Sequence, residues 1–264
     1  MRSTIITLTT DFGLRDPYVA ELKATILSIS PNAHVIDISH MIEKFNIKMG
    51  AYVLACAAPY FPEGTIHVAV VDPTVGSPRR PIIIQTERSY FVGPDNGLLV
   101  LAAKKQRIMR VHEITNPKFM MPKISNTFHG RDIFAPVAAH LANGIPLGRF
   151  GPETKKFVTP QYARVVRKGS RLIGEVLHID DFGNIITNFV EQHLTLAKSR
   201  PMFNVNIGKA KLRLRLYKAY ADALPHKPFM IVGSHGFLEV SVNQGDAARN
   251  LKVNSGDKVV LSLY

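Results

Sequence analysis

The first half of the chain alternates two hydrophobic patterns. Short β-branched runs predict buried strands at residues 4–9, 34–39 and 66–71. The segments between them, near residues 17–30 and 48–59, have the spacing and the end signals of helices. Strands that alternate with helices indicate an α/β domain with a mostly parallel sheet.

Further elements are expected before residue 150. The runs PIIIQT, SYFVG and RIMRV predict three shorter strands, and residues 131–144 predict an amphipathic helix that Asn143-Gly144 ends. At the start of the first helix, we expect Asp16 as the N-cap and Pro17 in the first helical position.

The pattern changes after residue 150. Residues 151–170 are rich in glycine, proline and charge, which is typical of a linker. Short strand-like runs follow, separated by turn signals, and they favour a β-sandwich or a β-barrel. We therefore expect an α/β domain at 1–150, a linker at 151–170 and an all-β domain at 171–264.

The composition is that of a globular protein, because 46% of the 264 residues are apolar and 20% are charged. No apolar run approaches the roughly 20 residues that a membrane span needs, and the N-terminal stretch lacks the features of a signal peptide. The single cysteine, Cys56, excludes an intramolecular disulfide framework and a cysteine-based zinc site. We expect a cytoplasmic protein that does not enter a membrane.

The formal net charge of +13 is compatible with a nucleic-acid partner. However, the densest basic run, Lys209–Lys218, alternates cations with apolar residues at the period of a half-buried strand. A solvated strand face explains this run better than a phosphate-binding face. Because the sequence has no helix-turn-helix, ribonucleoprotein or RGG motif, nucleic acid is not the expected partner.

Polar residues follow the first predicted strand, and α/β sheets bind ligands beyond the carboxyl ends of their strands. Asp11 and Asp16 lie in TTDFGLRDPY, across a turn that contains Gly13. A carboxylate at this position can bind ribose hydroxyls through paired hydrogen bonds. The alternatives are an Asx-turn for Asp11 and a helix cap for Asp16.

The loop after the third strand, VVDPTVGSPRR, combines a carboxylate with two guanidinium groups. Asp72 can pair with Arg79 or with Arg80, and the guanidinium would keep the carboxylate ionised and oriented. The alternative is turn chemistry with an ion pair on the surface.

A third cluster, FHGRD, places His129 and the Gly130 amide at the start of a helix, where negative charge is stabilised. A lone histidine before a helix is more often structural than catalytic. Its weight as a candidate comes from the two acidic loops that are expected at the same sheet edge.

In the second half, IDDFGNIITN gathers Asp180, Phe182 and Asn184 around Gly183. An amide and an aromatic ring together can bind an adenine by hydrogen bonds and stacking. The alternative is a β-hairpin turn. A similar glycine-rich stretch later in the chain contains Ser234 and Glu239.

Several motifs are absent. The sequence has no P-loop, no G-x-G-x-x-G after the first strand, no G-x-S-x-G and no H-E-x-x-H, so Walker-type hydrolysis and ordinary dinucleotide binding are disfavoured. The histidines are dispersed and give no spacing support for a metal site. We expect neither a metal nor a cofactor.

Seven motifs that follow one another along the chain resemble those of the S-adenosylmethionine hydroxide adenosyltransferases, relatives of the adenosylmethionine-dependent fluorinase and chlorinase. The motifs are TTDFG, DISH, VVDPTVGSPRR, GPDNGLL, FHGRDIFAPVAAHLA, IDDFGNIITN and LEVSVNQGDAA. The resemblance implies an α/β domain followed by a β-barrel-like domain. It also implies a homotrimer, with active sites between the first domain of one subunit and the second domain of its neighbour. The implied reaction is attack of water-derived hydroxide on C5′ of S-adenosylmethionine, which releases adenosine and methionine.

The resemblance also implies roles for particular residues. Asp72, Arg79 and His129 match the set that activates water in the hydrolases. The substrate-binding positions that it implies are Asp11 and Phe45 near the ribose, Asp16, Asp180 and Ser234 near the methionine, and Phe182 and Asn184 near the adenine.

Two alternatives to a hydrolase remain, a halogenase of the same fold and a non-catalytic protein that binds nucleosides or nucleic acid. By the resemblance, the fluorinase has Tyr in place of Asp72 and a halide-binding Ser in place of Gly130, and an acidic side chain beside the nucleophile would repel a halide. This favours water. Thr74 stands where the family commonly has Gly, and it would be strained if that position required a positive φ.

Overall fold

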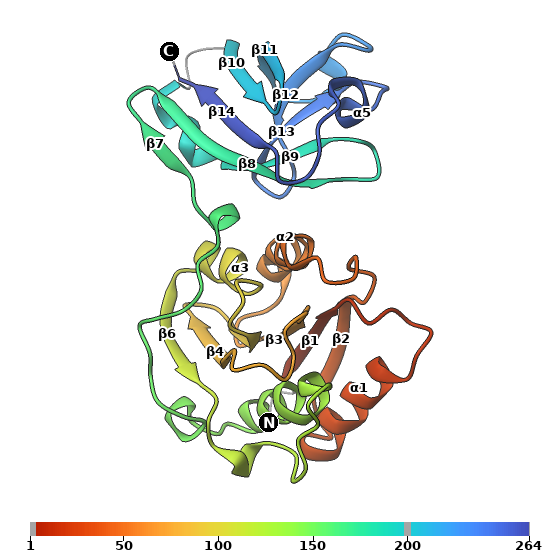
Figure 1. Cartoon of the computed structure of the whole chain (residues 1–264), viewed down its shortest axis with the longest axis vertical. Coiled ribbons are helices and arrows are strands. Elements are labelled where there is room, and N and C mark those ends of the chain that lie inside the picture. Colours follow the sequence, from red (N-terminus) through yellow and green to blue (C-terminus); the bar gives the residue numbers. More distant parts are fainter. Residues whose placement is uncertain (1–3, 198–201, 264) are drawn as a thin grey trace. The chain divides into compact units, whose positions relative to one another are not determined.

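The computed structural model describes residues 4–197 and 202–263 (Figure 1). The chain divides into two compact units, Met1–Thr159 and Pro160–Tyr264, which we call unit 1 and unit 2. The division falls inside the segment 151–170 that the sequence predicts as a linker. Part of that segment is a strand, because Val166–Lys168 pairs with the strand that follows it.

Unit 1 is built on a six-stranded sheet of order β2-β1-β3-β5-β4-β6. Its strands are β1 (Ile5–Thr10), β2 (His34–Ser39), β3 (Ile66–Val70), β4 (Pro81–Thr86), β5 (Tyr90–Pro94) and β6 (Ile108–Glu113). The first four in spatial order are parallel, whereas β4 is antiparallel to both of its neighbours. The predicted α/β class with a mostly parallel sheet is confirmed.

Helices cover both faces of this sheet, and Figure 1 shows α1 and α2 on opposite sides. The helices of unit 1 are α1 (Tyr18–Ile29), α2 (Ile47–Ala57), α3 (Val100–Lys105) and α4 (Ala135–Ala142). Short 3₁₀ turns lie at Ala58–Tyr60, Pro117–Phe119 and Leu147–Arg149. Fully buried strand residues such as Ile6, Leu8 and Val68 form the core between helices and sheet.

The start of α1 differs from the sequence prediction. The helix begins at Tyr18, so Pro17 occupies the N-cap and no side chain caps the helix. The prediction of Asp16 as N-cap was therefore wrong by one position. Asp16 is an exposed loop residue whose side chain is not used by α1.

The predicted helix at 131–144 also differs, because it has two parts. A π-helical turn at Gly130–Phe134 precedes α4. Pro136 has no N–H for the carbonyl of Asp132, and that carbonyl accepts a hydrogen bond from Met121 N instead, at 2.9 Å. The segment is buried almost throughout rather than amphipathic.

Strand order places a ligand-binding crevice beside β1. From β1 the chain passes through α1 to β2 on one side, and then through α2 to β3 on the other side. The loops after β1 and β3 therefore diverge at a topological switch point, where open α/β sheets bind ligands.

Unit 2 is a closed β-barrel. Seven strands follow the order β14-β10-β11-β12-β13-β9-β8, and pairing of β8 with β14 closes the ring. The strands of the ring are β8 (Arg171–Ile179), β9 (Ile185–Val190), β10 (Met202–Ile207), β11 (Ala210–Tyr217), β12 (Pro228–Val232), β13 (Phe237–Val242) and β14 (Lys258–Ser262). An eighth strand, β7 (Val166–Lys168), pairs with β8 outside the ring. The described residues of the unit also form the helix α5 (Ala247–Leu251) and 3₁₀ turns at Gln161–Ala163, Glu191–Ala197 and Tyr220–Asp222. The expected barrel-like fold is confirmed.

The basic run of the sequence lies on β11. Lys211, Arg213 and Arg215 are exposed, whereas Leu214 is buried in the barrel core. This is the half-buried strand that the alternation predicts. Among the described residues, no helix has the length and apolar character needed to cross a membrane.

Candidate active site

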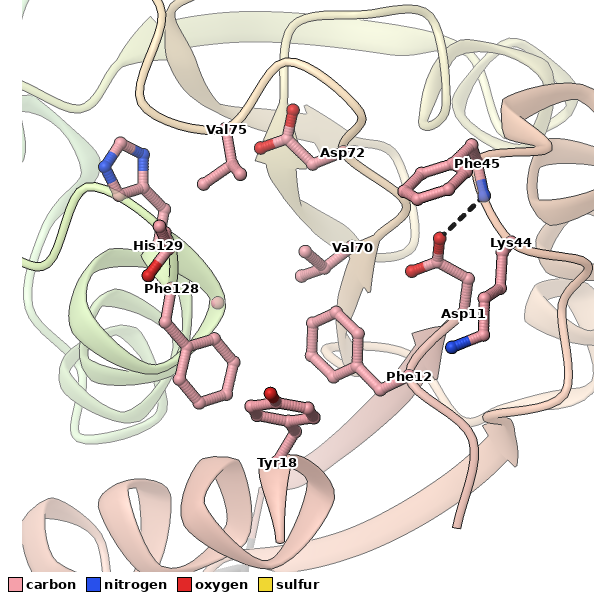
Figure 2. Close-up of a pocket in the computed structure, with 12 residues that line it drawn as sticks. Asp11, Phe12, Tyr18, Lys44, Phe45, Val70, Asp72, Val75, Phe128 and His129 are labelled. Carbon is pink, nitrogen blue, oxygen red and sulfur yellow. Dashed lines mark hydrogen bonds between the residues drawn. The ribbon is translucent and has the colours of Figure 1, made fainter. Parts of the chain in front are cut away.

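Unit 1 contains a cavity of about 340 Å³ at the carboxyl ends of β1 and β3 (Figure 2). It is lined by Asp11, Phe12, Tyr18, Lys44, Phe45, Val70, Asp72, Val75, Thr127, Phe128, His129 and Gly130. Five residues that the sequence nominates lie together in this wall: Asp11, Phe45, Asp72, His129 and Gly130. They come from loops that the chain visits far apart in sequence.

Arg79 joins Asp72 to His129. Its Nε donates to Asp72 Oδ2 at 2.8 Å, and its Nη2 lies 2.5 Å from the same oxygen. The same Nη2 lies 2.7 Å from Nδ1 of His129. The side chains of Arg79 and Asp72 are only 8% and 4% exposed, so water and salt screen this pair weakly.

The contact with Arg79 fixes the proton on His129. A guanidinium has donors but no acceptor, so Nδ1 of His129 must accept and the neutral ring carries its proton on Nε2. The pKa of His129 lies below its usual value, mainly because of burial and further because of the charge on Arg79. His129 is therefore a neutral imidazole with an N–H to offer and with its lone pair already used.

The two carboxylate oxygens of Asp72 have different partners, and Oδ1 does not contact Arg79. Both Arg79 donors meet Oδ2, whereas Oδ1 accepts from the Thr74 hydroxyl at 3.3 Å, a long hydrogen bond. Thr74 does not adopt a positive φ, so the strain considered for it is absent. Gly76 does, at 80°, and a Cβ there would lie 2.4 Å from the backbone oxygen of Asn126, so this turn requires glycine.

The side-chain contacts also decide between the two arginines. Arg80 Nη2 lies 2.5 Å from Oδ2 of Asp95, in the loop after β5. Asp95 Oδ1 accepts a hydrogen bond from Val158 N at 2.8 Å. Arg80 therefore holds a neighbouring loop, and Arg79 is the partner of Asp72.

Asp11 and Phe45 are directly linked. Asp11 Oδ2 accepts a hydrogen bond from the backbone N–H of Phe45 at 2.9 Å, which Figure 2 marks with a dashed line. Phe45 has a left-handed backbone with φ of 66°, and the residue is 66% exposed. The Asx-turn considered for Asp11 is not what its carboxylate forms, because that oxygen reaches across to the loop after β2.

An aromatic wall completes the cavity, and the sequence analysis did not identify it. Phe12, Tyr18 and Phe128 pack edge to face, with ring centroids 5.2 to 6.0 Å apart. Phe12 and Phe128 lie inside the motifs TTDFG and FHGRD, and that was the available signal. Lys44, which lies on the Asp11 side of the cavity in Figure 2, was missed as well.

Gly130 lies against this wall. A Cβ built on Gly130 would be 3.4 Å from both Phe12 Cζ and Phe128 Cε2, at the limit of ordinary van der Waals contact. Asp16 is not among the residues that line the cavity.

The candidates of unit 2 are described separately, because they occur in the β8–β9 turn. Asp180 Oδ1 accepts from Phe182 N at 3.0 Å and from Asn184 N at 2.8 Å, and its Oδ2 accepts from Asn184 Nδ2 at 2.9 Å. The hairpin-turn interpretation is confirmed. Phe182 is 80% exposed, so this turn presents a free aromatic ring.

Ser234 is exposed in the turn between β12 and β13, next to Gly233. Behind it lies Glu239, whose Oε2 accepts a hydrogen bond from the Tyr220 hydroxyl at 3.0 Å. Burial, and further the charge of Asp180, raises the pKa of Glu239. The sequence analysis noted Glu239 but assigned it no role.

Two family models match this chain. The model of the SAM hydroxide adenosyltransferase N-terminal domain matches residues 6–151, and that of the C-terminal domain matches residues 174–260. The chain belongs to the SAM hydroxide adenosyltransferase family. The resemblance stated from the motifs is confirmed.

The relatives of this SAM hydroxide adenosyltransferase include proteins named as hydrolases and proteins named as fluorinases. An (R)-S-adenosyl-L-methionine hydrolase of Methanocaldococcus jannaschii is 40% identical, with 97% of this chain and 94% of the relative covered. A hydrolase of the same name from Thermus thermophilus is 37% identical, with 95% and 96% covered. A fluorinase of Actinoplanes sp. is more distant, at 26% identity over 98% and 97%.

The fold has solved relatives as well. The crystal structure of an uncharacterized conserved protein from Thermotoga maritima matches with a TM-score of 0.86 and 38% identity, covering 98% of this chain and all of that one. In the part of the chain that the structure describes, no group of three or more His, Cys, Asp or Glu side chains is placed to hold a metal ion.

Proposed function

We propose that this chain hydrolyses S-adenosyl-L-methionine to adenosine and L-methionine. The observation that carries the proposal is the Asp72–Arg79–His129 constellation beside the cavity of unit 1. Asp72 Oδ1 can accept a hydrogen bond and His129 Nε2–H can donate one, and together these two groups can orient one water molecule. The relatives with 37% and 40% identity are named as hydrolases of this compound, which supports the same substrate here.

The reaction needs a placed nucleophile rather than an acid. As the water oxygen bonds to C5′, the C5′–S bond breaks and its electron pair goes to sulfur, so the sulfonium leaves as the neutral thioether of methionine. The water proton passes to Asp72 Oδ1 and later to solvent. Because the sulfonium is already an excellent leaving group, correct positioning of the oxygen provides most of the acceleration.

Arg79 and His129 have supporting roles in this scheme. Arg79 occupies Oδ2 of Asp72 and thereby directs Oδ1 toward the water. His129 cannot take the water proton on Nδ1, which already accepts from Arg79, so its Nε2–H holds the nucleophile in place. Asp72 also opposes a halide in this position by charge repulsion, which favours water over halogenation.

We assign the remaining residues to substrate binding. Asp11 and Phe45 would hold the ribose, and Gly130 leaves room beside the aromatic wall. Asp16, Asp180 and Ser234 would contact the methionine portion, and Phe182 with Asn184 the adenine. No metal or cofactor takes part in the scheme.

We also propose a cytoplasmic homotrimer whose active sites combine unit 1 of one subunit with unit 2 of its neighbour. Large apolar side chains near the cavity support this: Leu14 is 69% and Tyr18 is 45% exposed. Mixing the variants Asp72→Asn and Phe182→Ala tests it, because a shared site restores part of the activity in mixed trimers. Failure of the mixture to exceed the sum of its parts would contradict shared sites.

The function is tested by incubating purified protein with S-adenosylmethionine, using both sulfonium epimers, with and without chloride or fluoride. Adenosine and methionine in equal amounts, independent of halide, are the expected products. A 5′-halo product would replace the hydrolase with a halogenase. No turnover of either epimer, with nucleoside or RNA bound instead, would overturn both enzymatic readings.

A further inference from the structure

One motif of the sequence, DISH at residues 37–40, has no role in the site described above. Its histidine, His40, is 3% exposed and lies at the end of β2, next to the loop that follows β1. A buried histidine beside a binding loop needs an explanation, because burying an imidazole without partners is costly.

A chain of contacts runs from the surface through His40 to β1. Lys23 Nζ lies 2.6 Å from Asp37 Oδ2, and Asp37 Oδ1 lies 3.0 Å from His40 Nε2. On the other side of the ring, His40 Nδ1 lies 2.8 Å from the hydroxyl of Thr10, which is fully buried. Burial acts to raise the pKa of Asp37, but Lys23 and His40 together hold it below its usual value.

His40 holds the loop after β1 through two hydrogen-bonding contacts, one of its side chain and one of its backbone. The Thr10 hydroxyl that it contacts accepts a hydrogen bond from Phe12 N at 3.2 Å. In addition, the backbone oxygen of His40 accepts from Gly13 N at 2.8 Å. An irregularity in the β1–β2 register, after Leu8, brings the end of β2 into this position.

The segment that His40 grips, Asp11–Gly13, contributes two groups to the cavity. They are the Asp11 carboxylate, which also accepts from Phe45 N, and the Phe12 ring of the aromatic wall. Besides the bond from Phe45 N, the direction of the Asp11 carboxylate depends on its backbone, which lies between Thr10 and the two N–H groups that His40 and Thr10 hold. His40 does not line the cavity itself.

We infer that His40 is a positioning residue for ribose recognition, which acts through Thr10 to aim the Asp11 carboxylate. This inference rests on the proposed function, in which Asp11 binds the ribose. A carboxylate discriminates a hydroxyl from a hydrogen only when its direction is fixed to within hydrogen-bond geometry. Loss of the His40 contact should therefore reduce discrimination for ribose hydroxyls more than it reduces the rate of the chemical step.

The same strand provides a matched control. Thr7 on β1 lies 2.7 Å from Nδ1 of His67 on β3, and both residues are fully buried. This second pair has the same contact between a threonine hydroxyl and Nδ1, but it lies in the interior of the sheet, and neither residue lines the cavity. A purely structural effect of losing a buried histidine should be common to both pairs.

The experiment measures kcat/KM for S-adenosylmethionine and for its analogues that lack the 2′- or the 3′-hydroxyl. The readout is the ratio of kcat/KM for the parent to that for each analogue. His40→Asn should lower at least one of these ratios about tenfold, the loss of one well-directed hydrogen bond. His67→Asn should leave both ratios within about twofold, whatever it does to the melting temperature.

A second pair of variants tests the same inference if His40→Asn does not fold. Thr10→Val removes the hydroxyl at nearly constant volume and should lower the same ratio, whereas Thr10→Ser should restore it. Equal ratios in wild type and His40→Asn, or equal losses in His40→Asn and His67→Asn, would overturn the inference. A wild type that turns over both analogues as well as the parent would also overturn it. A wild type with no turnover of S-adenosylmethionine would instead refute the proposed function.

Discussion

Asp72 in unit 1 and Asp180 in unit 2 each follow a strand closely, yet their oxygens have different partners. Asp72 meets a side chain seven residues away, Arg79, through one oxygen. Asp180 accepts three hydrogen bonds from its own turn, from Phe182 N, Asn184 N and Asn184 Nδ2. The first carboxylate belongs to a cavity wall and keeps one oxygen that meets only the long hydrogen bond from Thr74, whereas the second holds the shape of a loop.

The two carboxylates are therefore suited to different roles, Asp72 to proton transfer and Asp180 to the positioning of a binding loop. A carboxylate that is anchored through one oxygen can accept a proton on the other, so unit 1 carries the chemistry in the proposed reaction. A carboxylate whose two oxygens both accept hydrogen bonds from its own turn fixes the position of its neighbours, here the exposed residue Phe182. Substitutions at the two positions should therefore change different kinetic constants.

The largest effect is expected from Asp72→Asn. An asparagine can still meet Arg79, but it cannot accept the water proton, so kcat should fall by about 10³-fold, within the range for loss of a general base. KM should change by less than about threefold. The measurement is steady-state kinetics of adenosine release. A large rise in KM with kcat retained would show that Asp72 binds substrate rather than activating water.

A smaller effect of the opposite kind is expected from Asp180→Asn. The NH₂ group of the new asparagine would replace one of the two acceptor oxygens. It would then face a group that is itself a donor, either the Asn184 side-chain amide or a backbone N–H. Hydrogen bonds to a charged group are worth about 1.5–3 kcal/mol, so KM should rise about 10- to 100-fold with kcat nearly unchanged. If this variant lost kcat as Asp72→Asn does, the division between the two units would not hold.

The smallest expected effect is on the pH dependence of kcat/KM, and it tests whether His129 acts as a neutral imidazole. Because burial and Arg79 lower its pKa, His129 stays neutral below the usual histidine value of about 6.5. At pH 6, an ordinary histidine would leave about a quarter of the enzyme in the neutral form. Because the pKa of His129 is lowered, we expect kcat/KM at pH 6 to retain more than this share of its maximum.

The loss at still lower pH should follow protonation of His129, which would place a second cation beside Arg79. The unfolded chain binds this proton more readily than the folded chain, so the free energy of unfolding also falls as pH drops below about 6.5. Circular dichroism at each pH separates this from loss of activity in the folded enzyme. A profile already halved at pH 7 would contradict a neutral, lowered-pKa His129.

Much of the fold followed from local patterns, since each predicted strand of unit 1 has a structural counterpart within a few residues. The exceptions depend on backbone hydrogen bonds that periodicity does not report. Pro136 produced a π-helical turn because it could not supply an N–H to Asp132. Likewise, the first helix begins after Pro17 rather than at it.

The candidate site was predicted best where several strand ends converge. The rule that ligands bind at the carboxyl edge brought the loops of Asp11 and Asp72 together correctly. Neither composition nor spacing could choose between Arg79 and Arg80, because that choice depends on which guanidinium faces the loop after β5. The aromatic wall was also out of reach, since Tyr18 joins Phe12 and Phe128 only through tertiary packing.

Phe45 has a strained backbone conformation, and one hydrogen bond holds it in place. A non-glycine residue in the left-handed region costs about 1–3 kcal/mol, and the exposed ring of Phe45 recovers little of this by packing within its own chain. Its N–H bond to Asp11 holds the strained backbone in place. The hydrogen bond to Asp11 therefore offsets part of the cost of this conformation, and loss of the Asp11 carboxylate should relax the loop after β2 as well as remove a ligand-binding group.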